Sequence, residues 1–178
     1  MNASAVPPEA WYQTKEVIGA ITGAAVAFFL VVAYDLLRSR RRRRAHFAAL
    51  RAELEYCRTL ADTYLRDQIA APLYRLPTHA YSASFPALLA DAALSEAETS
   101  KLLQFFVEVE TLNRGLEQAE EARLIDNEVL RDEKLKAEYG RNRLKAERLV
   151  PLNALTQSYY GHARAALDAR LRWYRLLA

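Results

Sequence analysis

An uncharged apolar run near the N-terminus, followed at once by a cluster of arginines, limits what this chain can form. From Val17 to Tyr34 there is no charged residue and no proline, and the apolar character extends to Leu37. As a helix, these roughly 21 residues span about 31 Å, the thickness of the hydrocarbon core of a bilayer. A run of this length that is apolar on all sides does not suit one face of a soluble helix. The sequence therefore predicts a transmembrane helix over residues 16–37.

The charges on either side of this run predict its orientation. Residues 1–16 hold one lysine and two glutamates. The basic juxtamembrane run, residues 38–44, follows the span and contains Arg38, Arg40, Arg41, Arg42, Arg43 and Arg44. Positive residues favour the cytoplasmic side, and a cleaved signal peptide carries its positive charge before the apolar run. We therefore expect an uncleaved anchor, with residues 1–15 as a short extracytoplasmic tail and residues 45–178 as a cytosolic domain.

The arginine cluster has three readings as a functional feature. It stops translocation and sets the topology. It also attracts anionic lipid headgroups, at about 1 kcal/mol per basic residue near the surface. Nucleic acid is not the expected partner, because the run lacks interleaved aromatic residues and lies against the bilayer. Six of the 25 basic residues lie in this run and 22 residues are acidic, so the rest of the chain is slightly acidic.

Small residues recur along one side of the predicted span. Gly19, Gly23 and Ala27 follow one another at intervals of four. Such a row lets two helix backbones approach closely in a membrane. It predicts self-association or docking on another membrane protein, although glycine and alanine are also common in membrane helices for no such reason.

The rest of the chain has the composition of long helices. Five glycines and six prolines are few for 178 residues, and no segment alternates polar and apolar residues over the length of a strand. We expect an all-α protein, in which the transmembrane helix continues into the long helix of a cytosolic antiparallel helical bundle with a charged helical extension. The single cysteine excludes an intramolecular disulfide and fits a reducing compartment.

Apolar side chains at alternating steps of three and four mark the first cytosolic helix, over residues 45–70. The stripe defines a predicted bundle and assembly face: Phe47, Leu50, Leu54, Cys57 and Tyr64. We expect the anchor to run into this helix without a break.

Three prolines then predict an irregular connector over residues 71–87, packed on the bundle by its aromatic and apolar residues. Within it, Thr78 is placed to cap a single helical turn that carries His79, and another short turn is expected over residues 88–93. Ser95 and Glu98 form a capping box that begins the next helix. This helix is expected to bend or end at residues 113–115.

Residues 117–148 are rich in charge and poor in apolar side chains, so they predict an exposed helix or helical hairpin with Gly140 as its break. The charged faces are those of solvated helices or of an arm that binds a partner. Pro151 is expected to begin the last helix in its first turn. The inner stripe of that helix contains Leu152, Leu155, Tyr159, Ala163, Ala166, Arg170, Trp173 and Leu177, with Leu167, Leu171 and Tyr174 alongside.

No residue pattern predicts catalysis, a metal or a cofactor. His46, His79 and His162 lie in separate segments, and no second ligand stands at a helical spacing from any of them. Cys57 lies on an apolar face, where a buried and inert thiol is the usual role. We therefore expect a non-enzymatic protein without a cofactor.

The outline of the chain resembles small uncharacterised bacterial single-pass membrane proteins with a cytosolic helical domain. The similarity rests on the segment Leu76–Tyr81, on Leu88-Leu89 and on the segment Phe105–Asn113. It implies a bacterial inner-membrane location and a helical fold, and it carries no catalytic residue.

The sequence is compatible with two functions of different classes. The first is a non-enzymatic membrane-anchored protein that assembles into a homo-oligomer or serves as an adaptor or accessory subunit at the cytoplasmic membrane face. The second is an oligomeric membrane-perturbing effector of a bacterial defence or toxin system. Loss of membrane potential on overexpression, abolished by Gly19→Leu and Gly23→Leu, would favour the second.

Overall fold

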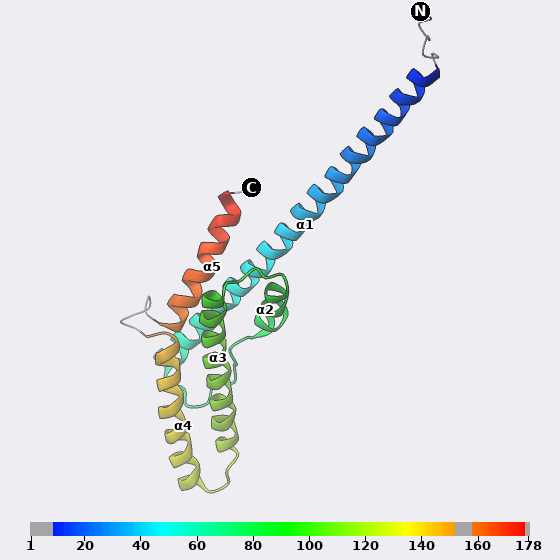
Figure 1. Ribbon diagram of the computed structural model, residues 1–178. Helices are drawn as coiled ribbons and strands as arrows, with labels where there is room; N and C mark the ends of the chain where they lie inside the picture. The colour runs from blue at the N-terminus through cyan, green and yellow to red at the C-terminus, as the bar shows by residue number, and fades with distance from the viewer. Residues whose placement is uncertain (1–8, 152–157, 177–178) are drawn as a thin grey trace, which may run out of the picture. The chain divides into compact units, whose positions relative to one another are not determined.

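The computed structural model describes residues 9–151 and 158–176, and the described residues form five helices and no strand. Figure 1 shows the helices in chain order. They are α1 (Glu9–Asp67), α2 (His79–Ala90), α3 (Glu96–Arg123), α4 (Glu128–Leu149) and α5 (Tyr159–Leu176). The expectation of an all-helical chain is confirmed.

Helix α1 spans two compact units of the chain, residues 1–42 and residues 43–178. It runs through the arginine cluster without interruption, as expected. In the first unit, α1 contains a segment that is long and apolar enough to cross a membrane, and none of that segment is buried.

The second unit has one hydrophobic core, to which all five helices contribute. The apolar stripe of α1 enters this core, since Phe47, Leu50 and Leu54 are fully buried. Aromatic rings join the helices there. The ring of Tyr81 in α2 stacks on that of Phe106 in α3 with 4.2 Å between centroids, and Phe47 lies 5.9 Å from Tyr174 of α5.

Helix α2 replaces the two separate turns expected in the second half of the connector. It has 12 residues and includes Pro86, which lies on its exposed side. Thr78 occupies the N-cap position but makes no side-chain cap hydrogen bond. The cap comes from α1 instead: the two carboxylate oxygens of Glu53 accept hydrogen bonds from the backbone N–H groups of Ala80 and Tyr81, both at 2.7 Å. Glu53 is buried, and its carboxylate at the positive end of α2 stabilises that helix and joins it to α1.

The first half of the connector is irregular and packs on α3. The side-chain amide of Asn113 makes two hydrogen bonds to the backbone of Leu76, both of 2.8 Å. Arg75 pairs with Glu120, and Arg123 donates to the carbonyl of Ala71. Asn113 therefore holds the connector and does not end its own helix, so the prediction that the helix ends at residues 113–115 is wrong.

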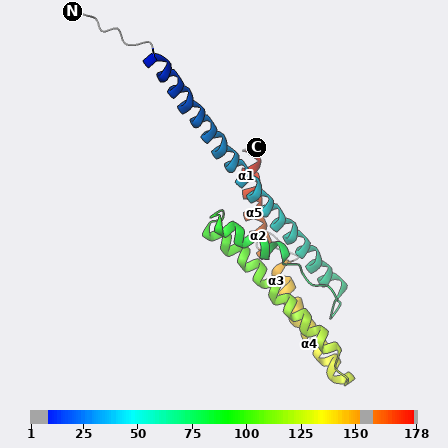
Figure 2. The same ribbon diagram turned by 90° about the vertical axis from the view of Figure 1, so that its right-hand side faces the viewer.

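Helices α3 and α4 lie side by side as a hairpin (Figure 1), and Figure 2 shows the same pair from its edge. The turn falls at residues 124–127, where the Asn127 side chain accepts from the N–H of Leu130 and caps α4. Gly140 lies inside α4, so the expected break at that position is also wrong. Of the two predicted forms of this charged segment, an exposed helix or a helical hairpin, the structure has the hairpin. The segment is not exposed throughout, because Asn142, Ala146 and Leu149 of α4 are buried.

Gly115 marks a close approach of α3 and α4. A Cβ atom there would overlap Oδ1 of Asn142 and lie 2.8 Å from Nζ of Lys145. Asn142 is fully buried, and its side-chain amide has no hydrogen-bond partner in the structure. The amide therefore has little room to move away.

We expect Gly115→Ala to destabilise the protein by about 1–2 kcal/mol, because overpacking exceeds the gain in helix propensity. Gly140→Ala is the matched control: nothing lies within 4 Å of its Cβ position, and it should stabilise α4 by about 1 kcal/mol. Guanidinium unfolding of the detergent-solubilised chain, followed by circular dichroism, measures both. Asn142→Ala should restore stability to Gly115→Ala, and a Gly115→Ala variant as stable as Gly140→Ala would contradict the close approach.

Helix α5 begins at Tyr159, and Pro151 lies outside any helix. Three residues of the expected inner stripe lie outside the described residues: Leu152, Leu155 and Leu177. The buried side of α5 contains Tyr160, Ala163 and Leu167, whereas Trp173 is 49% exposed. The expected stripe is confirmed at Ala163 and Ala166, and the flanking Leu167 and Tyr174 are also buried, but the prediction is wrong at Trp173.

The capping box at the start of α3 is confirmed and is larger than the sequence suggested. Ser95 accepts from the N–H of Glu98, and the Glu98 carboxylate accepts from the N–H of Ser95. Arg170 of α5 adds a bidentate ion pair to the same carboxylate, at 2.7 and 2.6 Å. The Arg170 guanidinium, followed by the bonds from Ser95, lowers the pKa of Glu98 from 4.5 to about 2.

This pair predicts a loss of stability in acid. A carboxyl group whose pKa is lowered by folding stabilises the folded state above its unfolded pKa and loses that contribution as the pH falls through its folded pKa. The free energy of unfolding should therefore fall between about pH 4.5 and pH 2, by about 1–2 kcal/mol once solvent screening of the half-exposed arginine is included. Unfolding titrations across this range measure it. In Glu98→Gln this part of the pH dependence should disappear, and an unchanged slope would contradict the assignment.

Candidate functional site

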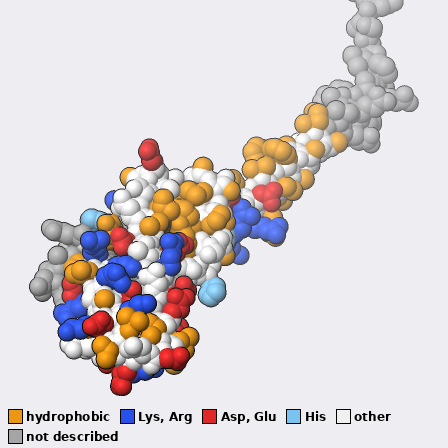
Figure 3. All heavy atoms as spheres, turned by 90° about the horizontal axis from the view of Figure 1, so that it is seen from below, with side chains coloured by type: hydrophobic (Ala, Val, Ile, Leu, Met, Phe, Trp, Pro, Cys, Tyr) orange, Lys and Arg blue, Asp and Glu red, His pale blue; other side chains and the backbone are white. Residues whose placement is uncertain are grey.

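The residues predicted to act in the membrane lie on an exposed part of α1. Gly19, Gly23 and Ala27 are all exposed, and, among the described residues beyond the neighbouring backbone of α1, no atom lies within 4 Å of a Cβ built on either glycine. Large apolar side chains surround them on every side of the helix, including Phe29, which is 70% exposed. Figure 3 shows these hydrophobic side chains along α1.

The arginine cluster follows on the same helix. Arg38, Arg40, Arg41 and Arg44 are exposed, as a lipid-facing or solvated cluster requires. Arg43 differs, because its Nε donates to the carboxylate of Asp91 at 3.2 Å, just beyond α2. Arg43 therefore also has a role in the fold of the second unit.

The predicted assembly face lies inside the chain. Each of its members is at most 1% exposed and belongs to the core: Phe47, Leu50, Leu54, Cys57 and Tyr64. Side chains buried in their own chain have no surface left for a second copy. These residues therefore stabilise the fold, and the assembly role that we expected of them has no exposed group to carry it.

Local structure accounts for His46, His79 and Cys57. His46 shares a hydrogen bond of 3.0 Å with the hydroxyl of Ser84, and His79 begins α2. The thiol of Cys57 donates to the carbonyl of Pro77 at 3.2 Å, and burial, followed by the charge of Glu53, raises its pKa to about 12. A thiol with so high a pKa is unreactive at neutral pH. Over the described ranges, no three acidic, histidine or cysteine side chains gather as metal ligands.

A charged network connects α1 and α5, and the sequence analysis did not find it. From α1, Arg51 reaches Asp168 of α5 at 2.5 Å. Arg164 of α5 lies between two carboxylates, with its Nε 3.4 Å from both Glu55 and Asp168. Arg58 lies near Glu55 and Asp62, at 3.9 and 3.8 Å. Basic and acidic groups thus alternate along the contact between the two helices.

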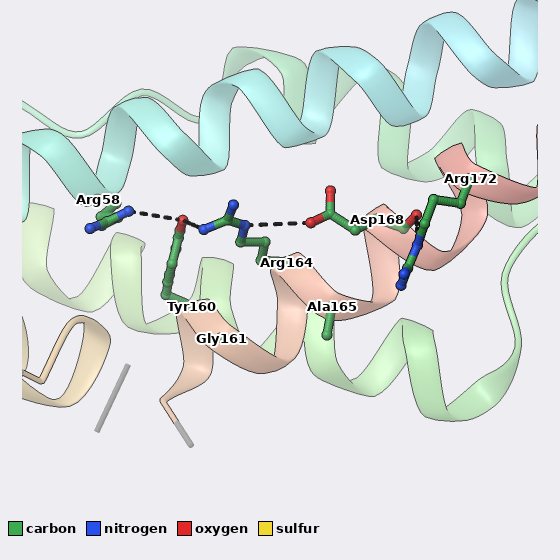
Figure 4. A pocket seen from close by; sticks show the side chains of 7 residues that line it. All are labelled: Arg58, Tyr160, Gly161, Arg164, Ala165, Asp168 and Arg172. Atoms are coloured by element: carbon green, nitrogen blue, oxygen red, sulfur yellow. Dashed lines mark hydrogen bonds and ion pairs between the residues drawn. The ribbon is translucent and has the colours of Figure 1, made fainter. Parts of the chain in front are cut away.

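Tyr160 stands at the centre of this network (Figure 4). Its hydroxyl donates to Glu55 at 2.7 Å and accepts from Arg58 at 3.3 Å and from Arg164 at 3.1 Å. Both guanidinium groups also lie over its ring, 5.2 and 5.9 Å from the centroid. Burial, followed by the hydrogen bond to Glu55, raises the pKa of Tyr160, so the hydroxyl stays protonated at neutral pH. The tyrosine therefore fixes the positions of two arginines.

A pocket of about 460 Å³ opens along this network. It is lined by Arg58 of α1 and by residues of the first part of α5 that Figure 4 labels: Tyr160, Gly161, Arg164, Ala165, Asp168 and Arg172. Three arginines and one aspartate give the lining a net positive charge. The N-terminal end of α5 adds the positive end of a helix dipole.

The sequence indicated which residues of this network share a helix face, both on α5 and on α1. Tyr160, Arg164, Asp168 and Arg172 follow one another at intervals of four, which places them on one face of a helix. Arg51, Glu55, Arg58 and Asp62, at steps of four, three and four, share one face of α1 in the same way. Nothing in the sequence indicated that these two faces meet, because they lie more than 100 residues apart.

Comparison with known proteins gives no match, whether with protein-family models, with curated proteins or with solved structures. The chain is therefore characterised by its own geometry: an all-helical protein with one long apolar helix near the N-terminus and an arginine-lined pocket between α1 and α5.

Proposed function

We propose that this chain is a single-pass membrane protein that acts without catalysis, as an assembly or adaptor subunit at the cytoplasmic face. The observation that carries the proposal is the exposed apolar part of α1, followed by the arginine cluster. Its large apolar side chains are 38–70% exposed between Ile18 and Leu37. Monomeric soluble proteins rarely expose a contiguous apolar patch beyond a few hundred Å². A bilayer removes this surface from water.

The arginine cluster supports a single orientation. It follows the apolar segment directly, and most of its members are exposed. The positive-inside rule then assigns the second unit to the cytoplasm, with the arginines at the anionic headgroups. A reporter enzyme that is active only in the cytoplasm should be active when it is fused after Ala178. Activity of a reporter that works only in the periplasm would contradict this orientation.

The second unit supports a role in recognition. We propose that the cytosolic part of α1 and helices α2 to α5 form an antiparallel bundle, from which the α3–α4 hairpin presents a docking end. Apolar side chains are exposed there among charged ones: Leu124 is 81%, Val129 71% and Leu130 44% exposed. Figure 3 views the molecule from below, where such side chains gather. Exposed apolar groups in a polar surround are typical of partner sites.

The row formed by Gly19, Gly23 and Ala27 is the proposed contact between copies in the membrane. Open space next to both glycines lets a second helix approach closely. The contact would be made by dispersion between backbones, since lipid supplies no hydrophobic drive for association.

Disulfide cross-linking in native membranes tests this contact with a matched pair of variants. Ala27→Cys places a thiol on the proposed face, and Ala25→Cys places one about 200° from Gly23, on the opposite side of the helix. The native Cys57 does not interfere, because it is buried and its pKa is raised to about 12. We expect a cross-linked dimer for Ala27→Cys alone. Equal yields from the two variants, or monomer from both without any co-purifying protein, would contradict assembly through this face.

A further inference from the structure

The pocket between α1 and α5 has features of a binding site that the proposed membrane role does not use. It lies within the second unit and is built from two helices that are far apart in the sequence. Its volume of about 460 Å³ falls in the range of small-molecule sites. Its lining holds three guanidinium groups in a row: Arg58 at one end, Arg164 in the middle and Arg172 at the other end (Figure 4).

The carboxylates of the network balance this charge only in part. Glu55, Asp62 and Asp168 face Arg51, Arg58 and Arg164, which leaves Arg172 without a carboxylate among its described contacts. Arg172 uses only its Nε, which donates to the backbone carbonyl of Asp168 at 3.3 Å. The lining therefore keeps an excess positive charge at the α5 side of the pocket.

The three arginines also keep hydrogen-bond donors for a ligand. A guanidinium has five N–H donors. Arg58 and Arg164 each use Nη1 to donate to the Tyr160 hydroxyl. Because Tyr160, Glu55 and Asp168 hold these two side chains in place, their other donors are positioned in advance, which reduces the entropy lost on binding. Rigid, paired N–H groups match the oxygens of a phosphate group.

We propose that this pocket binds a phosphate-bearing anion, held by Arg58, Arg164 and Arg172. The volume exceeds that of a single phosphate, so the ligand is a phosphoester or a pyrophosphate. The phosphate group has two possible sources, a soluble metabolite or a lipid headgroup. The inference does not depend on the proposed assembly role, because the pocket lies within a single chain.

The experiment uses the full chain in nanodiscs of neutral lipid, with inorganic pyrophosphate as the soluble probe and titration calorimetry as the measurement. Saturable binding is expected. Arg172→Gln and Arg58→Gln should each weaken it about tenfold or more, the size of one charge-assisted hydrogen bond. Arg172 contacts only the backbone of its own helix, so its replacement should leave the fold intact. Arg114→Gln is the matched control, because Arg114 is exposed and lies outside the pocket. The affinity of this variant for pyrophosphate should stay within about twofold of the wild-type value.

A second arm distinguishes the lipid source. Nanodiscs with phosphatidic acid should protect Arg172 from the arginine reagent phenylglyoxal if a headgroup enters the pocket, and Arg58→Gln should abolish that protection. Binding of pyrophosphate in neutral discs identifies a soluble ligand, and protection by phosphatidic acid alone identifies a headgroup. Neither effect, or an equal loss in Arg114→Gln, would overturn the proposal. Stability and helicity of each variant are measured by guanidinium unfolding, so that a folding defect is not counted as lost binding.

Discussion

Replacing Phe28 and Val31 by arginine should release the protein from membranes. Both side chains lie near the centre of the proposed span and are exposed, 65% and 60% respectively. Each arginine at the centre of a membrane helix costs about 2.5–3.5 kcal/mol on insertion scales, so the pair costs about 5–7 kcal/mol. Flotation in a density gradient after alkaline extraction measures the effect, because inserted protein floats with lipid and aggregated protein does not.

The matched control is the double variant Phe28→Leu and Val31→Leu. It changes the same positions and keeps them apolar, so it should float like the wild type. If the arginine variant also floats after alkaline extraction, the exposed segment of α1 is not the membrane anchor and the proposed function loses its main support.

Phe106→Ala should destabilise the second unit by about 3–5 kcal/mol, the range for truncating a buried aromatic residue. The Phe106 side chain is fully buried. Its ring stacks on Tyr81 of α2 at 4.2 Å and meets the edge of Phe105 at 5.1 Å. Removal leaves a cavity between α2 and α3 and ends both ring contacts. Guanidinium unfolding in detergent, followed by circular dichroism, gives the change in free energy.

Val107→Ala serves as the neighbouring control for this prediction. Val107 lies one residue further along α3 and is 49% exposed, so its truncation should change stability by less than about 1 kcal/mol. Because a loss of several kcal/mol is a large part of the stability of a small domain, Phe106→Ala should also increase proteolysis of the second unit. Similar stabilities for the two variants would mean that α2 does not pack on α3 as described.

Several features of the fold could be predicted because they depend on neighbours within one turn or two. The stripe of α1 from Phe47 to Tyr64 followed from the helical spacing of apolar residues, and these side chains are buried. The capping box of Ser95 and Glu98 followed from two residues three apart, and both of its hydrogen bonds form. Continuity of α1 followed from the lack of any helix breaker through the arginines.

The position of the turn between α3 and α4 could not be predicted in the same way. Gly115 and Gly140 each suggest a break by their low helix propensity, yet both lie inside helices. At Gly115 the absence of a side chain admits Asn142 of the facing helix, so the residue serves packing. The turn falls at residues 124–127, where Asn127 caps the helix that follows.

In the candidate site, too, local features could be predicted from the sequence and long-range contacts could not. The sequence determined which residues share a face of α1 or α5, because the period of a helix fixes that within a few turns. It also determined the apolar run and its arginines, because their character is a matter of local composition. Only the tertiary structure decided that Glu53 caps α2 and that Tyr160 lies between Arg58 and Arg164. The contact of Glu53 with Ala80 joins residues 27 positions apart, and that of Arg58 with Tyr160 joins residues 102 positions apart. Their formation depends on how the core packs, which no local pattern encodes.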